Sequence, residues 1–175
     1  MKTKNLVVLA LLVGMGAVLH VVIPGIGAGM KPDMMLVMMF LGIILFPDVK
    51  SVLVLAIATG VISALTTSFP LGQIPNMIDK PVTAFIFFGL FMALKKYRSN
   101  IVSAGILTAI GTIVSGTVFL GSALLLFELP APFSVLFAGV VLPTVALNTI
   151  AMVILYPIAQ SIVKRTNLTG QTVNE

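Results

Sequence analysis

The sequence has no cysteine, a single histidine and very little charge. The absence of cysteine from the 175 residues excludes disulfides, zinc–thiolate sites, iron–sulfur clusters and thiol nucleophiles. His20 alone is too little for a metal cluster, and we interpret it as hydrogen-bonded near the outer end of the first apolar run. Charged residues make up 9% of the chain, whereas a soluble domain carries about 25%. Hydrophobic residues account for 59%, so we expect the surface to face a lipid bilayer.

Catalytic and nucleotide-binding motifs are also missing. The chain has no G-x-x-x-x-G-K-[ST] phosphate-binding loop. It has neither G-x-S-G nor G-x-S-x-G, the patterns that commonly carry a serine nucleophile. We therefore expect a protein that is not an enzyme and holds no cofactor or metal. The net charge of +5 does not indicate nucleic-acid binding, because the basic residues are spread over short segments between apolar runs.

Six apolar runs follow one another along the chain, and we interpret each as a membrane span. A spanning helix needs about 20 apolar residues, and the second and fourth runs are shorter than that. The first run is interpreted as a retained span rather than a signal peptide, because no A-x-A cleavage site follows it. The runs are Asn5–Ile23, Met34–Phe46, Ser51–Phe69, Val82–Leu94, Ile101–Phe127 and Phe133–Val163.

The basic residues support six spans and set their orientation. If the N terminus is cytoplasmic, alternating spans leave only Lys31 and Lys80 outside, and cytoplasmic loops are normally the basic ones. Omitting either short span would move the basic segment Lys95–Arg98 outside. We therefore predict one all-α domain over residues 1–175, a multi-pass membrane protein with both termini in the cytoplasm. The basic residues predicted inside are Lys2, Lys4, Lys50, Lys95, Lys96, Arg98, Lys164 and Arg165.

Prolines gather in the predicted outer loops. Pro32 and Pro81 are predicted to occupy the first turns of the second and fourth helices, where a missing N–H group costs nothing. The sixth run is too long for one straight helix. Because Pro143 interrupts this run, we expect Phe133–Leu142 to be a loop or re-entrant segment and the helix to begin near Pro143.

The outer loops also hold most of the candidate binding residues. Helices two, four and six would begin outside, and helix N-termini attract carboxylates. Asp33 and Asp79 are candidates for binding an ammonium group, with simple helix capping as the alternative. Asn148 lies within the sixth span, where an amide needs partners and serves either helix packing or ligand binding. The pattern favours a zwitterionic small molecule. The full candidate set is Lys31, Asp33, Gln73, Asn76, Asp79, Lys80 and Asn148.

Small and hydroxyl side chains recur at helical spacing. Ala10, Gly14 and Ala17 share one side of the first span, and small residues let membrane helices approach closely. For Ala10 and Gly14, contact with a partner protein and packing within the bundle are equal alternatives. Thr112 and Ser115 belong to a hydroxyl stripe in the fifth run, which we interpret as structural because such side chains commonly bond to the helix backbone.

Two segments of the chain resemble the tryptophan transporter TrpP family. They are Met30–Pro47, MKPDMMLVMMFLGIILFP, and Ala58–Lys80, ATGVISALTTSFPLGQIPNMIDK. The resemblance implies an S component, the substrate-binding subunit of an energy-coupling-factor (ECF) transporter in a bacterial cell membrane. Such a subunit is a six-helix bundle with a pocket open to the outside. Its partners would be a transmembrane coupling protein and two cytoplasmic ATPases, which explains why this chain lacks an ATP-binding motif.

The resemblance also implies a ligand and a docking motif. The loop positions and polarity of the candidate residues suggest how L-tryptophan would bind: its carboxylate at Lys31 or Lys80, its ammonium at Asp79 or Asp33, and its indole packed on phenylalanines. The indole N–H group would be accepted by Asn76, Gln73 or Asn148. Helix one of S components commonly contacts the coupling protein through Ala-x-x-x-Ala. The segment Ala10–Gly14 matches this spacing, with glycine in place of the second alanine.

Two other functions are consistent with the sequence. One is an S component for another small molecule, such as a vitamin, which a ligand screen by thermal shift separates from tryptophan binding. The other is a secondary transporter or small channel that works alone. Uptake in cells that lack the ECF ATPases would favour this second alternative.

Overall fold

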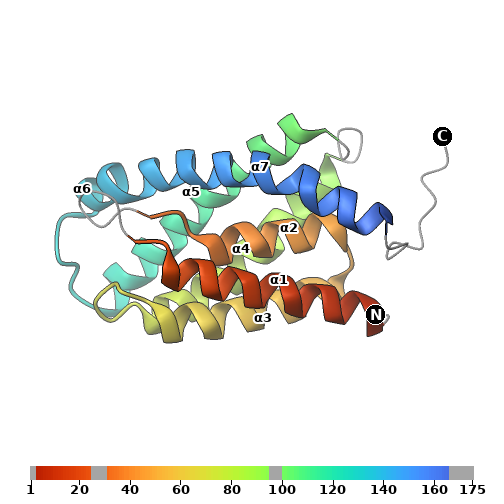
Figure 1. The fold of residues 1–175 in the computed structure, drawn as a ribbon. Helices are drawn as coiled ribbons and strands as arrows, with labels where there is room; N and C mark the ends of the chain where they lie inside the picture. The colour runs from red at the N-terminus through yellow and green to blue at the C-terminus, as the bar shows by residue number, and fades with distance from the viewer. Residues whose placement is uncertain (1–2, 25–30, 95–99, 166–175) are drawn as a thin grey trace.

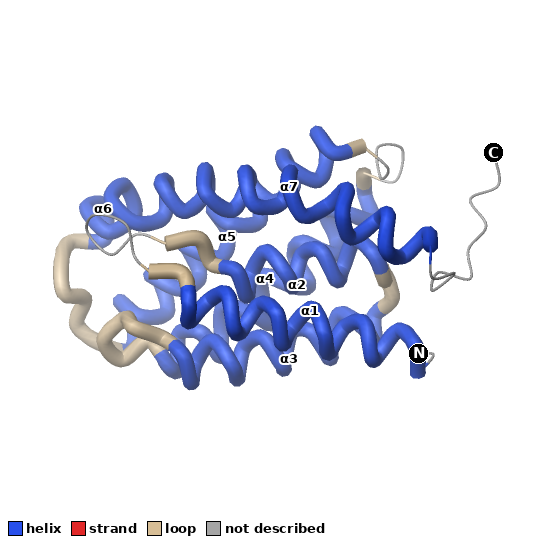
Figure 2. Tube along the Cα trace, viewed as in Figure 1, coloured by secondary structure: helices blue, strands red, loops and turns tan. Residues whose placement is uncertain are grey.

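The computed structural model describes residues 3–24, 31–94 and 100–165, and these form a bundle of helices (Figures 1 and 2). The described residues contain no β-strand. The helices are α1 (Thr3–Val22), α2 (Met34–Leu45), α3 (Val49–Thr66), α4 (Gln73–Ala93), α5 (Ile101–Leu126), α6 (Phe133–Leu136), the π-helix η2 (Phe137–Val141) and α7 (Leu142–Arg165).

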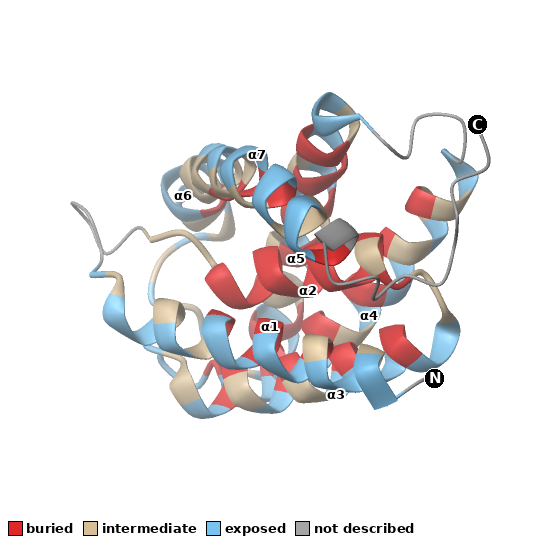
Figure 3. Ribbon diagram, turned by 45° about the vertical axis from the view of Figure 1, so that its right-hand side comes forward, coloured by how far each residue is buried: buried red, intermediate tan, exposed pale blue. Residues whose placement is uncertain are grey.

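Within the described residues, five helical segments are long and apolar enough to cross a membrane, and the short helix α2 supplies the sixth. All residues of α2 from Met34 to Ile44 are buried, and Figure 3 shows α2 in the middle of the bundle. Because other helices surround α2, its backbone is shielded from lipid although the helix has only 12 residues. The predicted all-α membrane fold is confirmed.

The connections alternate between two ends of the bundle. The first turn of α1 and the last turn of α7 lie at the same end, as an even number of segments requires (Figure 1). We call this the inner end, because Lys4 and Lys50 lie in the first turns of α1 and α3 there and basic residues mark the cytoplasmic side. The opposite end, where α2, α4 and α6 begin, is the outer end.

Helix α4 differs most from the sequence-based prediction, because it begins at Gln73 rather than at Val82. The predicted loop Gln73–Pro81 is therefore helical. Pro81 lies inside the helix rather than in its first turn, which instead contains Pro75. A proline is tolerated within a membrane helix where neighbouring helices enclose it. Gly60 of α3 lies close by, since a Cβ atom added to it would be 3.6 Å from Pro81 Cδ.

Two further predictions about helix starts are wrong. Pro32 lies outside α2, since Asp33 is the N-cap and the helix begins at Met34. Phe133–Leu142 is neither a loop nor re-entrant, because the chain is helical from Phe133 through α6, η2 and α7. The N–H group of Leu142 bonds to the carbonyl of Phe137, five residues back. This wider π turn lies just before Pro143, which has no N–H group to donate the next hydrogen bond of a regular α-helix.

Candidate functional site

The centre of the candidate site is a lysine that bridges two carboxylates from different helices. Lys80 Nζ lies 2.8 Å from Asp33 Oδ2 and 2.9 Å from Asp79 Oδ2. Asp79 and Lys80 lie within α4, and their side chains are 0% and 2% exposed. Buried charges this close to one another are paired because an isolated ion would be too costly away from water. Ionisable residues inside a membrane span are rare and typically functional.

Asp79 is held by more than its lysine. Its Oδ1 accepts a hydrogen bond from Thr83 Oγ1 at 2.7 Å, and its Oδ2 accepts one from Ser115 Oγ at 2.7 Å. Thr83 is one helical turn further along α4, whereas Ser115 comes from α5. Three donors therefore surround this carboxylate, which gives the buried charge the partners it needs.

Asp33 connects the start of α2 to the same lysine. Its Oδ1 caps α2 by accepting from the N–H group of Leu36 at 3.0 Å, while its own N–H donates to Asn148 Oδ1 at 2.8 Å. Asn148, on α7, donates in turn to Thr112 Oγ1 on α5 at 3.2 Å. Burial favours the neutral form of Asp33, but the positive charge and hydrogen bond of Lys80 outweigh it and hold the pKa of this carboxyl below its usual 3.8.

His20 and Lys31 complete the group at the outer end. His20 Nδ1 lies 3.7 Å from Asp33 Oδ1, and this buried nitrogen has no hydrogen-bond partner in the described part of the chain. The predicted hydrogen bond of His20 is therefore not made through Nδ1. Lys31 Nζ donates to the backbone carbonyl of His20 at 2.9 Å. We call His20, Lys31, Asp33, Asp79 and Lys80 the outer charge cluster.

Five of the seven predicted binding residues come together here. Lys31, Asp33, Asp79 and Lys80 belong to the outer charge cluster, and Asn148 contacts it. Asn76 is buried but donates to the carbonyl of Gly72 within its own helix, and Gln73 is exposed on α4. The capping alternative holds for Asp33 in addition to its ion pair, whereas Asp79 caps no helix.

Sequence reasoning missed three hydroxyl groups of the site. Thr112 and Ser115 were visible as a polar stripe, but their spacing did not show that they bond to Asn148 and Asp79 rather than to the backbone. Thr83 follows Asp79 by four residues, a spacing that brings side chains together on a helix. This signal was lost because Asp79 was assigned to a loop.

Apolar packing closes the bundle on the inner side of the cluster. Phe40 and Phe87 lie about two turns along α2 and α4 from Asp33 and Lys80, and their rings stack with centroids 4.0 Å apart. Gly111 of α5 fits against this pair, since an added Cβ atom would lie 2.6 Å from Phe40 Cζ. The cluster is therefore nearer to the outer end and is separated from the inner end by aromatic rings.

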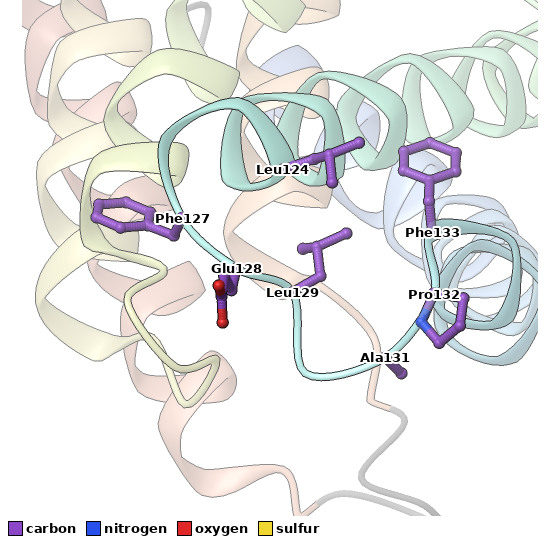
Figure 4. A pocket seen from close by; sticks show the side chains of 7 residues that line it. All are labelled: Leu124, Phe127, Glu128, Leu129, Ala131, Pro132 and Phe133. Atoms are coloured by element: carbon purple, nitrogen blue, oxygen red, sulfur yellow. The ribbon is translucent and has the colours of Figure 1, made fainter.

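An open hollow of about 500 Å³ lies at the outer end between α5 and α6 (Figure 4). Its lining is mainly apolar, and Phe133 on its wall stacks on Phe137 with centroids 5.9 Å apart. Glu128 supplies the one acidic side chain in this lining. The hollow does not include the outer charge cluster. The lining residues are Leu124, Phe127, Glu128, Leu129, Ala131, Pro132 and Phe133.

The small residues of α1 and α3 differ in exposure. Ala10 and Gly14 are exposed on α1, and a Cβ atom added to Gly14 would meet nothing within 4 Å. On α3, the small residues Ala56 and Gly60 are buried within the bundle. The exposed stripe on α1 is free to contact lipid or another protein.

Comparisons with known proteins identify the family. The family model described as "Tryptophan transporter TrpP" matches residues 2–164. A "Probable tryptophan transport protein" of Bacillus subtilis (strain 168) is 60% identical over 95% of this chain and 96% of its own length. A protein of the same description from Clostridium perfringens (strain 13 / Type A) is 42% identical over 95% of this chain and 96% of its own. No solved structure matches the chain. The chain is therefore a multi-pass bacterial membrane protein that belongs to the tryptophan transporter TrpP family.

Proposed function

We propose that this protein binds L-tryptophan from outside the cell and is the substrate-binding subunit of an ECF-type uptake transporter. The observation that carries the proposal is the outer charge cluster, in which positive and negative groups from α1, α4 and the segment leading into α2 come together near the outer end. A free amino acid has the same two kinds of charge. The relatives' description as probable tryptophan transport proteins supports tryptophan as that amino acid.

The site offers both polar and apolar contacts for such a ligand. Lys80 and Lys31 are the cations of the cluster available for a carboxylate, and Asp33 is the more exposed of its two carboxylates. Phe69 and Phe119 pack edge to face at 5.2 Å near the turn before α4. Aromatic rings of this kind are favourable partners for an indole. The bundle therefore has charged side chains for the ammonium and carboxylate of tryptophan and aromatic rings for its indole.

Dependence on partner proteins is supported by two features of the described bundle. The stacked rings of Phe40 and Phe87 lie between the cluster and the inner end, so tryptophan needs a conformational change or a movement of the subunit, which a partner could drive, to reach the cytoplasm. The exposed stripe at Ala10 and Gly14 offers a close-packing surface for a transmembrane coupling protein. Two cytoplasmic ATPases would supply the energy, since the chain has no phosphate-binding loop.

A secondary transporter that works alone is the second candidate function. The observation that favours it is the position of Asp79 and Lys80 inside a span, because intramembrane ionisable groups also serve ion-coupled transport. An S component for another small molecule, such as a vitamin, uses the same partners and differs only in its ligand.

Uptake of labelled L-tryptophan into cells with and without the ECF ATPases separates these functions. We expect uptake by cells that express this protein together with a complete ECF module, and loss of uptake when the ATPases carry an inactivating substitution in their own phosphate-binding lysine. Equal uptake without active ATPases would contradict the S-component assignment. Cells that lack this protein but retain the module provide the background.

A further inference from the structure

The two ion pairs of Lys80 are unequal. Asp79 is fully buried and accepts from Thr83 and Ser115 as well as from Lys80. Asp33 is 22% exposed, and Lys80 is the charged donor to its Oδ2, while its Oδ1 is used for capping α2. The pair with Asp33 is therefore the one that a molecule arriving from outside reaches first. When the Asp33–Lys80 pair opens, Lys80 remains paired with Asp79.

The charges of the cluster balance before any ligand binds. Lys31 and Lys80 contribute two positive charges, and Asp33 and Asp79 contribute two negative charges, with His20 neutral. A zwitterion brings one charge of each sign and keeps this balance. A ligand with only an ammonium or only a carboxylate leaves one uncompensated charge in a largely buried site, which is costly.

His20 supplies an additional polar atom beside Asp33. Its Nδ1 is buried, lacks a hydrogen-bond partner in the described residues and lies 3.7 Å from Asp33 Oδ1. Buried polar atoms are normally hydrogen-bonded. In the neutral tautomer that carries its proton on Nε2, Nδ1 is an acceptor and suits an ammonium group held at Asp33.

We propose that the Asp33–Lys80 ion pair recognises the ammonium and carboxylate groups of a free α-amino acid. The pair opens because each of its two side chains exchanges its partner for a group of the ligand. This inference rests on the proposed function. The ligand carboxylate replaces Asp33 at Lys80 Nζ, and the ligand ammonium replaces Lys80 at Asp33 Oδ2 and bonds to His20 Nδ1. Asp79 stays on Lys80 as a fixed anchor, while Lys80 and Asp33 each exchange one charged partner for another. The substrate class is amino acids with both charges free.

Ligands that lack one of the two charges provide the first test. The purified full-length protein is titrated by calorimetry with L-tryptophan, with tryptamine, which has no carboxylate, and with indole-3-propionate, which has no ammonium. Removing one partner of a buried charge pair corresponds to a loss of binding of at least about 100-fold. We expect both analogues to be weaker by this factor. An analogue that binds as tightly as tryptophan would overturn the proposal.

Matched substitutions at two helix N-caps provide the second test. Asp33→Asn preserves the cap, because asparagine is as good an N-cap as aspartate, but it removes the charge that the ligand ammonium requires. Asp48→Asn is the control, since Asp48 caps α3 at the inner end by accepting from the N–H group of Ser51. We expect Asp33→Asn to weaken tryptophan binding by at least about 100-fold and Asp48→Asn to leave it unchanged. Equal affinity of Asp33→Asn and the wild type would overturn the exchange.

The outcomes separate this inference from the proposed function. If tryptophan binds but does not need Asp33 or its own two charges, the exchange is wrong and the tryptophan assignment stands. If tryptophan fails to bind while another L-amino acid from a thermal-shift panel binds in an Asp33-dependent way, the exchange stands and the tryptophan assignment is wrong. If no amino acid binds the folded protein, both are wrong.

Discussion

Asn148 is the residue that ties α7 to the outer charge cluster. Its amide oxygen accepts from the backbone of Asp33, and its amide nitrogen donates to Thr112, so a single fully buried side chain connects α2, α5 and α7. The sequence is consistent with two roles for Asn148, helix packing and ligand contact. In the structure both of its polar atoms are used to position Asp33 and Thr112, which supports a positioning role.

Replacing Asn148 by alanine should destabilise the protein. The part-buried N–H group of Asp33 loses its acceptor, and a buried polar group left unsatisfied costs about 1–3 kcal/mol. The free energy of unfolding in mixed micelles measures the effect. Thr144→Ala on the same helix is the control, because within the described residues the Thr144 hydroxyl bonds only to the carbonyl of Val140 on the helix surface, and we expect a change within about 0.5 kcal/mol. Equal losses for the two variants would contradict the account of Asn148.

The stability supplied by Asp33 should depend on pH. Because Lys80 holds the pKa of Asp33 below its usual 3.8, the folded state favours the carboxylate more strongly than the unfolded state does. This contribution is complete above pH 3.8 and is lost as the pH falls through the lower folded-state pKa. Thermal unfolding measured along an acid series should therefore show a smaller decline for Asp33→Asn than for the wild type. Identical declines would show that Lys80 does not stabilise the Asp33 carboxylate in the folded protein.

At the scale of helices, α2 and α4 explain how a charged site fits into a membrane protein. Helix α2 is short and central, so its N-cap lies among other helices rather than in lipid. Helix α4 carries Asp79 and Lys80 on its buried side, against Gly60 of α3 and Ser115 of α5. Each charge therefore faces protein, where partners are available.

Sequence reasoning found the spans but not the interior of this site. The apolar runs and the basic residues were sufficient for six helical segments, since composition and charge asymmetry determine membrane topology. The segment Gln73–Pro81 was misassigned because its two prolines and its charges are typical of a loop. Asp33 and Lys80 are 47 residues apart in sequence, and only tertiary packing makes their charges neighbours and so makes a helix the better conformation for this segment.

Substitution of Gly111 should disturb the aromatic closure between the cluster and the inner end. The added methyl of Gly111→Ala would lie 2.6 Å from Phe40 Cζ and 2.9 Å from Phe87 Cδ2, and such overpacking costs about 1–3 kcal/mol of unfolding free energy. Gly121→Ala on the same helix is the control. It meets nothing within 4 Å and should be stabilising by roughly 0.5–1 kcal/mol, because glycine weakens a helix. If Gly111→Ala is as stable as Gly121→Ala, the rings do not pack as described.

At the scale of the whole molecule, the two ends and one side of the bundle have different properties. The outer end holds the charge cluster, the interior below it is closed by aromatic rings, and α1 exposes an apolar face with small residues at Ala10 and Gly14. These three features fit a subunit that binds its ligand on one side and depends on a partner for transfer.

A bulky residue at Gly14 should separate binding from transport. A Cβ atom added at Gly14 meets nothing within 4 Å and the position is exposed, so we expect Gly14→Leu to keep stability within about 0.5 kcal/mol of the wild type and to leave tryptophan binding unchanged. Close approach of a coupling protein would be blocked, and co-purification with the ECF module and uptake should both be lost. Gly121→Leu, at another open position, is the control. Normal assembly of Gly14→Leu would remove this stripe from the interface.

Fluorescence of tryptophan bound to the purified protein is the decisive measurement for the proposed ligand. The chain contains no tryptophan and only two tyrosines, so indole fluorescence excited at the red edge of the band reports on the ligand alone. We predict a saturable blue shift with one ligand per chain, as the indole leaves water for an apolar site, and loss of this shift in Asp33→Asn but not in Asp48→Asn. Emission that increases in proportion to added tryptophan, with the spectrum of the free amino acid, would contradict the account.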